Sequence, residues 1–271
     1  MDSQLFFEEL WKQYTLKTPS ALEIKSLFEK EGNTVFNDHI AIRTFDDPRI
    51  DIEVLARPFI KMGYREMGEY HFKAKKLYAK HYELENEPNA PKIFISQLLT
   101  HQFSNKLQQI IKEILDIIDQ DLFKQENLIL QGRIWDMIPS FKIYKELQKE
   151  SEYASWMYVN GFCSNHFTVN VNKLQNFESL SSVNDFLKSK GFKMNSSGGE
   201  IKGSPLQLLE QSSILADVID VAFEEGIEKI TSCYYEFAYR YPKKNGEIFN
   251  GFIANSADKI FESTDMKLQA S

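Results

Sequence analysis

Two short segments of this chain repeat one pattern, and each copy carries a histidine at the same position. Residues 38–45 read DHIAIRTF, and residues 165–172 read NHFTVNVN. Each copy starts with an acidic or amide residue and continues with the apolar alternation of a half-buried strand. Because His39 and His166 occupy matching positions, we predict a duplicated fold that brings the two imidazoles to one point.

A third strand-like segment, 232–241, carries a carboxylate in aromatic surroundings. It reads SCYYEFAYRY, so Glu236 lies among tyrosine and phenylalanine side chains, where an unpaired charge is costly. Two imidazoles and one carboxylate on rigid strands form a facial triad, the ligand set of non-haem Fe(II) oxygenases, with open positions for substrate and O₂. His39, His166 and Glu236 are therefore the predicted metal ligands. A structural salt bridge of Glu236 and two ordinary core histidines are the alternative interpretation.

Arg43 follows His39 on the same predicted strand and shares its face, because alternate residues of a strand point the same way. At a rise of ~3.3 Å per residue, Arg43 lies ~13 Å along the strand from His39. A guanidinium can hold a carboxylate through two parallel hydrogen bonds. We therefore expect Arg43 to bind an anionic substrate whose other end lies on the metal. Gln211 and Ser212 are polar within an apolar stretch and either add hydrogen bonds to a ligand or face water.

The remaining histidines are weaker candidates. His71 and His81 lie in predicted strands and could face the same cavity, although an ordinary place in the sheet explains them better. His101 follows the end of a predicted strand, so we expect it in a loop. None of the three is a predicted ligand.

The order of predicted elements is the same around both histidines. The first module has a helix over 50–62 and strands over 38–45, 64–72, 77–84 and 91–100. The second has a helix over 180–190, a strand over 162–171, a short strand pair at 192–196 and 201–202, a mostly strand-like stretch over 206–223 and a last strand over 232–241. Both helices end at a glycine, a natural helix stop. The pattern predicts an α+β fold of paired β-α-β-β-β modules, forming a half-barrel sheet around the metal site.

Helical periodicity outside the modules completes the predicted organisation. We expect N-terminal helices over 1–36, with Ser20 as the N-cap of the second one, and a helical insertion between the modules. The expected segments are the N-terminal helices 1–36, the first module 37–103, the insertion 104–155, the second module 156–250 and a loosely packed polar tail 251–271.

Composition excludes several classes of partner. The 271 residues carry a net charge of −7, which argues against nucleic acid, because phosphate binding needs a basic surface. No apolar run approaches the ~18–20 residues of a membrane span, and the acidic N-terminus does not resemble a signal peptide. The two cysteines, Cys163 and Cys233, form no disulfide framework. We therefore expect a cytoplasmic protein, as a monomer or small homo-oligomer, without membrane or nucleic-acid partners.

Several short motifs together resemble the DUF1338 family. They are DHIAIR at 38–43, YVNGF at 158–162 leading to NHFT at 165–168, GSP at 203–205 with QSS at 211–213, and YEFA at 235–238. The family includes 2-oxoadipate dioxygenase/decarboxylase enzymes. Its fold is related to the vicinal oxygen chelate superfamily, whose members are built from paired β-α-β-β-β modules. The resemblance extends from about the first predicted strand to the last.

The resemblance implies a reaction and a role for individual residues. His39, His166 and Glu236 match the metal ligands of the family, with Fe(II) as the implied metal. Arg43 matches the arginine that holds the substrate carboxylate. The implied substrates are O₂ and a 2-oxo dicarboxylic acid. With 2-oxoadipate the products are CO₂ and 2-hydroxyglutarate, a step of lysine catabolism.

Two other functions stay open at this point. A metal-dependent isomerase or lyase of the glyoxalase kind works without O₂ and usually has four protein ligands. Gln97 is the only candidate for a fourth ligand in the region of the first module that corresponds to Glu236. A non-catalytic binding module is the other possibility, and the intact His-His-Glu set with Arg43 argues against it.

Overall fold

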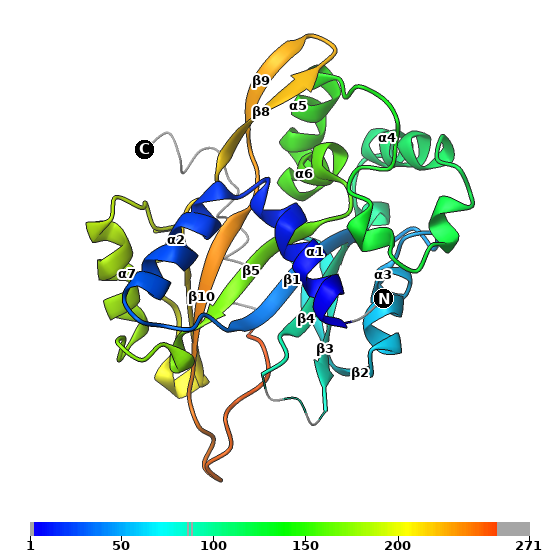
Figure 1. Cartoon of the computed structure of the whole chain (residues 1–271). Helices are drawn as coiled ribbons and strands as arrows, with labels where there is room; N and C mark the ends of the chain where they lie inside the picture. Colours follow the sequence, from blue (N-terminus) through cyan, green and yellow to red (C-terminus); the bar gives the residue numbers. More distant parts are fainter. Residues whose placement is uncertain (1–2, 86, 88, 254–271) are drawn as a thin grey trace.

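The computed structural model describes residues 3–85, 87 and 89–253 (Figure 1). Two helices, α1 (Ser3–Thr15) and α2 (Pro19–Lys30), precede the first strand. Pro19 occupies the first position of α2, where its fixed φ suits a helix and its missing N–H is not needed. Thr18 is therefore the N-cap residue, and the prediction of Ser20 is wrong. Within the described residues, no helix has the length and apolar character to cross a membrane.

Eight strands of the described residues form one curled sheet in the order β2-β3-β4-β1-β5-β10-β7-β6. Four come from the first half of the chain: β1 (Asn37–Phe45), β2 (Tyr64–Phe72), β3 (Leu77–Leu84) and β4 (Lys92–Leu98). Four come from the second half: β5 (Ser164–Asn170), β6 (Lys202–Ser204), β7 (Leu209–Ser213) and β10 (Tyr234–Arg240). The first strands of the two halves, β1 and β5, thus lie next to each other at the centre.

The two halves of the sheet repeat the same pairing. β1 pairs parallel with β4, and β5 pairs parallel with β10. Outward from there, the antiparallel series β4-β3-β2 corresponds to β10-β7-β6. One helix follows the first strand of each half, α3 (Ile52–Lys61) and α7 (Leu180–Ser189). The predicted α+β fold of paired β-α-β-β-β modules in a half-barrel is confirmed.

The two helices of the modules start and stop by the same local signals. Asp51 before α3 and Ser179 before α7 each accept a hydrogen bond from a backbone N–H of the first turn. Gly63 and Gly191 follow the helices with φ of +97° and +92°. A side chain would strain this left-handed conformation, so a glycine there ends each helix and redirects the chain.

Alternation along the central strands gives the sheet two different faces. Phe167 on β5 and Tyr235 on β10 point to α1, where both rings pack against Trp11. Figure 1 shows α1 and α2 crossing in front of the central strands, on this face of the sheet. His166 and Glu236 are the sequence neighbours of these two aromatic residues, so they point to the opposite, concave face.

The segment between β7 and β10 differs from the sequence prediction. We expected one strand over 206–223, but β7 ends at Ser213 and a separate hairpin follows, β8 (Val218–Phe223) with β9 (Gly226–Thr231). The predicted pairing of 192–196 with 201–202 is also wrong, because β6 pairs with β7. Figure 1 shows the hairpin projecting from the sheet beside α5 (Phe141–Glu150). Apolar alternation indicates a strand but not its partner, so it cannot distinguish the hairpin from the sheet.

The region between the modules is mainly helical. It contains α4 (Asn105–Asp116), α5 and α6 (Glu152–Asn160). α6 continues past residue 156, where we expected the second module to begin, and the first strand of that module is β5. The helix is buried almost throughout, and its side chains reach the concave face of the sheet near Arg43.

Candidate metal centre

Strand register places the three predicted metal ligands side by side on the concave face. His39 on β1 lies opposite Thr168 on β5, and Thr168 in turn lies opposite Glu236 on β10. The Thr168 hydroxyl is 3.1 Å from Nε2 of His39. His166 shares the face of Thr168, because it precedes that residue by two positions. The three side chains therefore meet above the junction of β1, β5 and β10.

The potential ligand atoms of these side chains converge. One ring nitrogen of each histidine and one oxygen of Glu236 all lie within 4.8 Å of one another. Nε2 of His39 is 3.4 Å from Oε1 of Glu236, and Nε2 of His166 is 3.2 Å from Oε2. Bonds from a metal ion to such ligands are ~2.0–2.2 Å long, so ligand atoms around one ion lie ~3 Å apart. The arrangement therefore suits one divalent ion.

The charge balance of the cluster also suits a cation. His39, His166 and Glu236 are 2%, 3% and 0% exposed. Burial raises the pKa of Glu236 to about 8 and lowers the pKa values of both histidines. Among the described residues, Oε2 of Glu236 has no hydrogen-bond partner. A bound cation would stabilise the carboxylate and use the neutral imidazoles, and this donor set is the one that Fe(II) takes in oxygenases.

The residue before each histidine forms a hydrogen bond with Nδ1, the ring nitrogen that does not face Glu236. Oδ1 of Asp38 lies 2.8 Å from Nδ1 of His39, and Oδ1 of Asn165 lies 3.1 Å from Nδ1 of His166. An acceptor at Nδ1 favours the tautomer whose Nε2 lone pair is free for a metal. The sequence carried this signal, because an acidic or amide residue precedes the histidine in both copies of the repeat.

Arg43 is buried beyond the cluster on β1. Its guanidinium carbon lies 4.8 Å from the ring centroid of Tyr153 and 4.9 Å from that of Trp156, both on α6. Nη1 is 3.5 Å from Glu152, whereas Nε and Nη2 are buried and have no partner among the described residues. Arg43 also lines a cavity of about 410 Å³. A buried cation with unused donors indicates a place for an anionic group.

Only one of the two predicted polar residues on β7 reaches the cluster. Nε2 of Gln211 donates to Oε1 of Glu236 at 2.6 Å. Ser212 points the other way, and its hydroxyl donates to Asn184 of α7 at 2.7 Å. Neighbouring residues of a strand face opposite sides of the sheet, so both could not bind one ligand. The prediction that Ser212 contacts the substrate does not fit this position.

The other histidines are not part of the three-residue cluster. His81 lies on the concave face and is buried, with its ring nitrogens near Tyr70 and Glu83 at 2.9 and 3.0 Å. His71 is exposed on β2, and His101 is exposed beside Asp46. His81 is therefore a neighbour of the site, as we considered, whereas His71 and His101 are surface residues.

Two aromatic residues beside the cluster were not predicted. The ring of Tyr234 stacks on His166 with centroids 4.7 Å apart, and its place two residues before Glu236 was a usable signal. The ring of Phe252 lies against His39 at 4.9 Å. The start of the predicted loose tail is thus packed, and the rest, from residue 254, lies outside the described residues. No sequence pattern pointed to Phe252.

The first module has no carboxylate at the position of Glu236. Glu236 on β10 pairs with Thr168, which lies two positions after His166. In the first module, the residue two positions after His39 is Ala41, and it pairs with Phe94 on β4. Gln97, the candidate for this place, instead accepts a hydrogen bond at 3.2 Å from the backbone of α3. Gln97 is therefore not placed as a fourth ligand, and the duplicated fold supplies one potential ligand from one module and two from the other.

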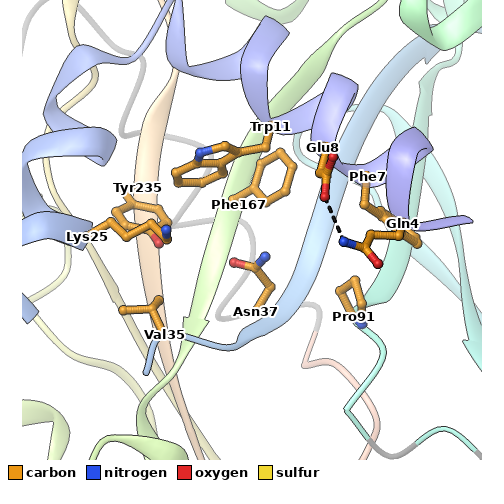
Figure 2. Close-up of a pocket in the computed structure, with 10 residues that line it drawn as sticks. All are labelled: Gln4, Phe7, Glu8, Trp11, Lys25, Val35, Asn37, Pro91, Phe167 and Tyr235. Carbon is orange, nitrogen blue, oxygen red and sulfur yellow. Dashed lines mark hydrogen bonds between the residues drawn. The ribbon is translucent and has the colours of Figure 1, made fainter. Parts of the chain in front are cut away.

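A separate cavity lies on the helical face of the sheet. Its volume is about 340 Å³. Figure 2 shows Trp11 of α1 among the residues that line it, together with Phe167 and Tyr235 of the sheet. Its lining is mainly apolar. The sheet lies between this cavity and the cluster, because neighbouring strand residues point to opposite faces. The cavity is therefore not part of the candidate metal centre.

Comparisons with known sequences match most of this chain. A sequence model of the family described as 2-oxoadipate dioxygenase/decarboxylase matches residues 12–249. The chloroplastic 2-oxoadipate dioxygenase/decarboxylase of Arabidopsis thaliana is 36% identical over 254 residues, which are 84% of this chain and 67% of that protein.

Solved structures give the same relationship. The hydroxyglutarate synthase of Oryza sativa in complex with 2-oxoadipate is 32% identical, with a TM-score of 0.92 over 98% of this chain and 93% of that chain. A protein of Shewanella frigidimarina NCIMB 400 is 46% identical, with a TM-score of 0.88 over 93% of this chain and 98% of that chain.

Proposed function

This chain belongs to the 2-oxoadipate dioxygenase/decarboxylase family, and on that basis we propose that it is a non-haem Fe(II) enzyme acting on 2-oxoadipate. In the proposed reaction, 2-oxoadipate and O₂ become 2-hydroxyglutarate and CO₂, as in lysine catabolism. One carbon leaves as CO₂, one oxygen atom of O₂ enters the new carboxylate, and the other becomes the hydroxyl group. O₂ is the only oxidant that this reaction requires.

The observation that carries the proposal is the convergence of His39, His166 and Glu236 within 4.8 Å on a buried face. Fe(II) held by these residues would supply the redox chemistry with O₂ that decarboxylation and hydroxylation require. Two imidazoles and one carboxylate leave open positions for a 2-oxo acid and O₂. The three side chains are buried, and a buried site limits side reactions of the bound substrate with water.

The residues around the cluster have distinct proposed roles. Asp38 and Asn165 orient the histidines, and Gln211 orients Glu236 through its hydrogen bond to Oε1. Arg43 binds the substrate carboxylate that is remote from the metal, because its buried Nε and Nη2 donate to no acceptor among the residues that the structure describes. Tyr153 and Trp156 keep the guanidinium in place through cation–π contacts.

An isomerase or lyase of the glyoxalase kind is less well supported. Such an enzyme usually uses four protein ligands, and the equivalent of Glu236 in the first module is Phe94. A phenyl ring cannot bind a divalent ion as a ligand. The difference between the two modules leaves three potential protein ligands. Three ligands leave positions on the ion free for substrate and O₂, which favours the dioxygenase reaction.

Oxygen uptake by the iron-loaded protein tests the proposal. The protein is loaded with Fe(II) without O₂ and then given O₂ and 2-oxoadipate, with 2-oxoglutarate and buffer as controls. We expect O₂ consumption to match the release of CO₂ and the formation of 2-hydroxyglutarate. Bound iron without uptake on 2-oxoadipate would contradict the proposed substrate. Turnover of a 2-oxo acid without O₂ would favour the isomerase or lyase.

A further inference from the structure

Tyr234 places a buried phenol next to the cluster of His39, His166 and Glu236. Its position on β10 pairs with His166 on β5, and its ring stacks on that histidine with an angle of 29° between the planes. The side chain is 0% exposed, and its hydroxyl has no hydrogen-bond partner among the described residues. A buried hydroxyl normally has a partner, so this one requires an explanation.

Tyr234 lies on the side of the cluster where Arg43 lies. Across the sheet, His166 has Tyr234 on one side and Ala41 on the other. Arg43 follows two positions after Ala41, so Tyr234 is nearer than Glu236 to the arginine along the strands. Ala41, which lies between His39 and Arg43 on this face, has only a methyl side chain.

Charges around Tyr234 are consistent with this position. Burial raises its pKa well above the usual range, the charge of Glu236 adds to the rise, and the charge of Arg43 opposes it. The hydroxyl of Tyr234 can donate one hydrogen bond.

Three buried donors in this region lack an acceptor within residues 3–85, 87 and 89–253: Nε and Nη2 of Arg43 and the hydroxyl of Tyr234. A carboxylate has two oxygens and can accept from all three. We propose that Tyr234 is a substrate-binding residue whose hydroxyl donates to the same distal carboxylate that Arg43 binds. This inference rests on the proposed function, and it adds a second group that recognises a dicarboxylic over a monocarboxylic 2-oxo acid.

The next residue provides a matched control. Tyr235 is also buried on β10 and its hydroxyl also lacks a partner among the described residues. However, Tyr235 points to the helical face and lines the cavity of Figure 2. Loss of the hydroxyl at either position keeps the aromatic ring. Only the substitution at Tyr234 changes the concave face.

Ligand binding without turnover tests the proposal. The full chain and its Tyr234→Phe, Tyr235→Phe and Arg43→Gln variants are loaded with Fe(II) in the absence of O₂, and iron content and thermal stability are recorded. The dissociation constants of 2-oxoadipate and of 2-oxohexanoate, which lacks the distal carboxylate, are then measured by calorimetry. For Tyr234→Phe we expect about a 10- to 100-fold weaker binding of 2-oxoadipate, because a hydrogen bond to a charged group is lost.

The pattern across ligands and variants decides the outcome. Tyr234→Phe should leave 2-oxohexanoate binding and iron content unchanged, and Tyr235→Phe should change neither ligand. In the Arg43→Gln background the effect of Tyr234→Phe should shrink, because both residues hold one group. Unchanged 2-oxoadipate binding, or an equal loss for both acids, would overturn the role of Tyr234 alone. An iron-loaded parent protein that does not bind 2-oxoadipate would overturn the proposed function and this inference together.

Discussion

Arg240 holds Asp38 through two parallel hydrogen bonds, Nε to Oδ2 at 2.7 Å and Nη2 to Oδ1 at 2.8 Å. Burial by itself would raise the pKa of Asp38, but Arg240 and His39 keep the pKa of this carboxyl well below its usual range. Asp38 remains a carboxylate and accepts from Nδ1 of His39. The orientation of a proposed ligand on β1 thus depends on a charge on β10.

Arg240 also connects the cluster to the end of the described chain. Its Nη1 donates to the carbonyl oxygens of Phe249 and Gly251 at 3.1 and 2.8 Å, and the guanidinium lies 5.2 Å from the ring of Phe252. The same side chain therefore fixes Asp38 and the segment that carries Phe252 over His39.

We predict that Arg240→Gln weakens both the fold and the metal site. Removing one partner of a buried ion pair leaves the other charge uncompensated, at a cost of about 3–5 kcal/mol in the free energy of unfolding. Loss of the group that fixes the ligand support should reduce Fe(II) affinity about 10- to 100-fold. Urea unfolding and anaerobic Fe(II) titration measure the two effects.

Lys229→Gln is the control for this prediction. Lys229 pairs with Asp220 at 2.8 Å on the exposed hairpin, where an ion pair contributes about 0–1 kcal/mol. A loss of stability in Lys229→Gln as large as that in Arg240→Gln would argue against a special role for the buried pair.

Substitution of a cluster residue should remove the metal. We expect His39→Ala, His166→Ala and Glu236→Ala each to abolish retention of Fe(II), because two remaining side chains hold an ion poorly in competition with water. His101→Ala should retain iron like the parent, since His101 is exposed beside Asp46. Metal analysis after anaerobic loading and desalting gives the stoichiometry.

Metal removal should also lower the melting temperature of the parent protein, because an ion that binds only the folded chain stabilises it. A chelator should therefore reduce the melting temperature of the parent and of His101→Ala. It should have little effect on the three cluster variants. A Glu236→Ala protein with full iron and full activity would contradict the assignment.

Gln211 and Ser212 make a second matched pair. Gln211→Leu removes the donor that holds Oε1 of Glu236 at 2.6 Å, so we expect about a 10-fold or greater loss of Fe(II) affinity. Ser212→Ala removes a hydroxyl that bonds to Asn184 on the other face. It should cost stability but leave Fe(II) affinity unchanged, and equal affinity losses in the two variants would refute the proposed role of Gln211.

Glu225 provides a pH-dependent contact far from the cluster. It lies in the turn of the β8–β9 hairpin and accepts from the N–H of Phe141 at 2.6 Å and from the hydroxyl of Ser140 at 2.7 Å, at the start of α5. These hydrogen bonds, with that of Phe141 the largest cause, lower the pKa of Glu225 from 4.5 to about 2. A lowered pKa means that the folded state favours the carboxylate.

The lowered pKa of Glu225 makes the stability of the fold depend on pH. The contribution of Glu225 to stability is complete above pH 4.5 and disappears as the pH falls towards 2. The difference in unfolding free energy between the parent and Glu225→Gln should thus be largest near neutral pH and shrink on acidification. A difference that stays constant from pH 7 to pH 3 would contradict this account.

The repeated module order could be derived from the sequence because its signals are local. Apolar alternation with a period of two marked β1, β2, β3 and β5 within one or two residues, and Gly63 and Gly191 marked the helix ends. The same alternation assigned His39 and Arg43 to one face. A strand carries this information in a few consecutive residues.

Other features could not be derived because they depend on which strands pair. The hairpin of β8 and β9 has the same alternation as a sheet strand, and only its packing beside α5 distinguishes it. Gln211 and Ser212 are both polar, and the pairing of β7 with β10 decides which of them faces Glu236. These are contacts between distant parts of the chain.

By itself, the sequence determined the duplicated module, the three proposed ligands and the arginine on their face, because residue type and strand period are local properties. The tertiary structure decided which face is concave, that Arg240 supports Asp38 and that Phe252 lies over His39. It also revealed that the hydroxyl of Tyr234, beside His166, has no hydrogen-bond partner in the described part of the chain. Such relationships arise only when strand register and helix packing bring side chains together across the sheet. A local sequence pattern does not encode which distant residues become neighbours.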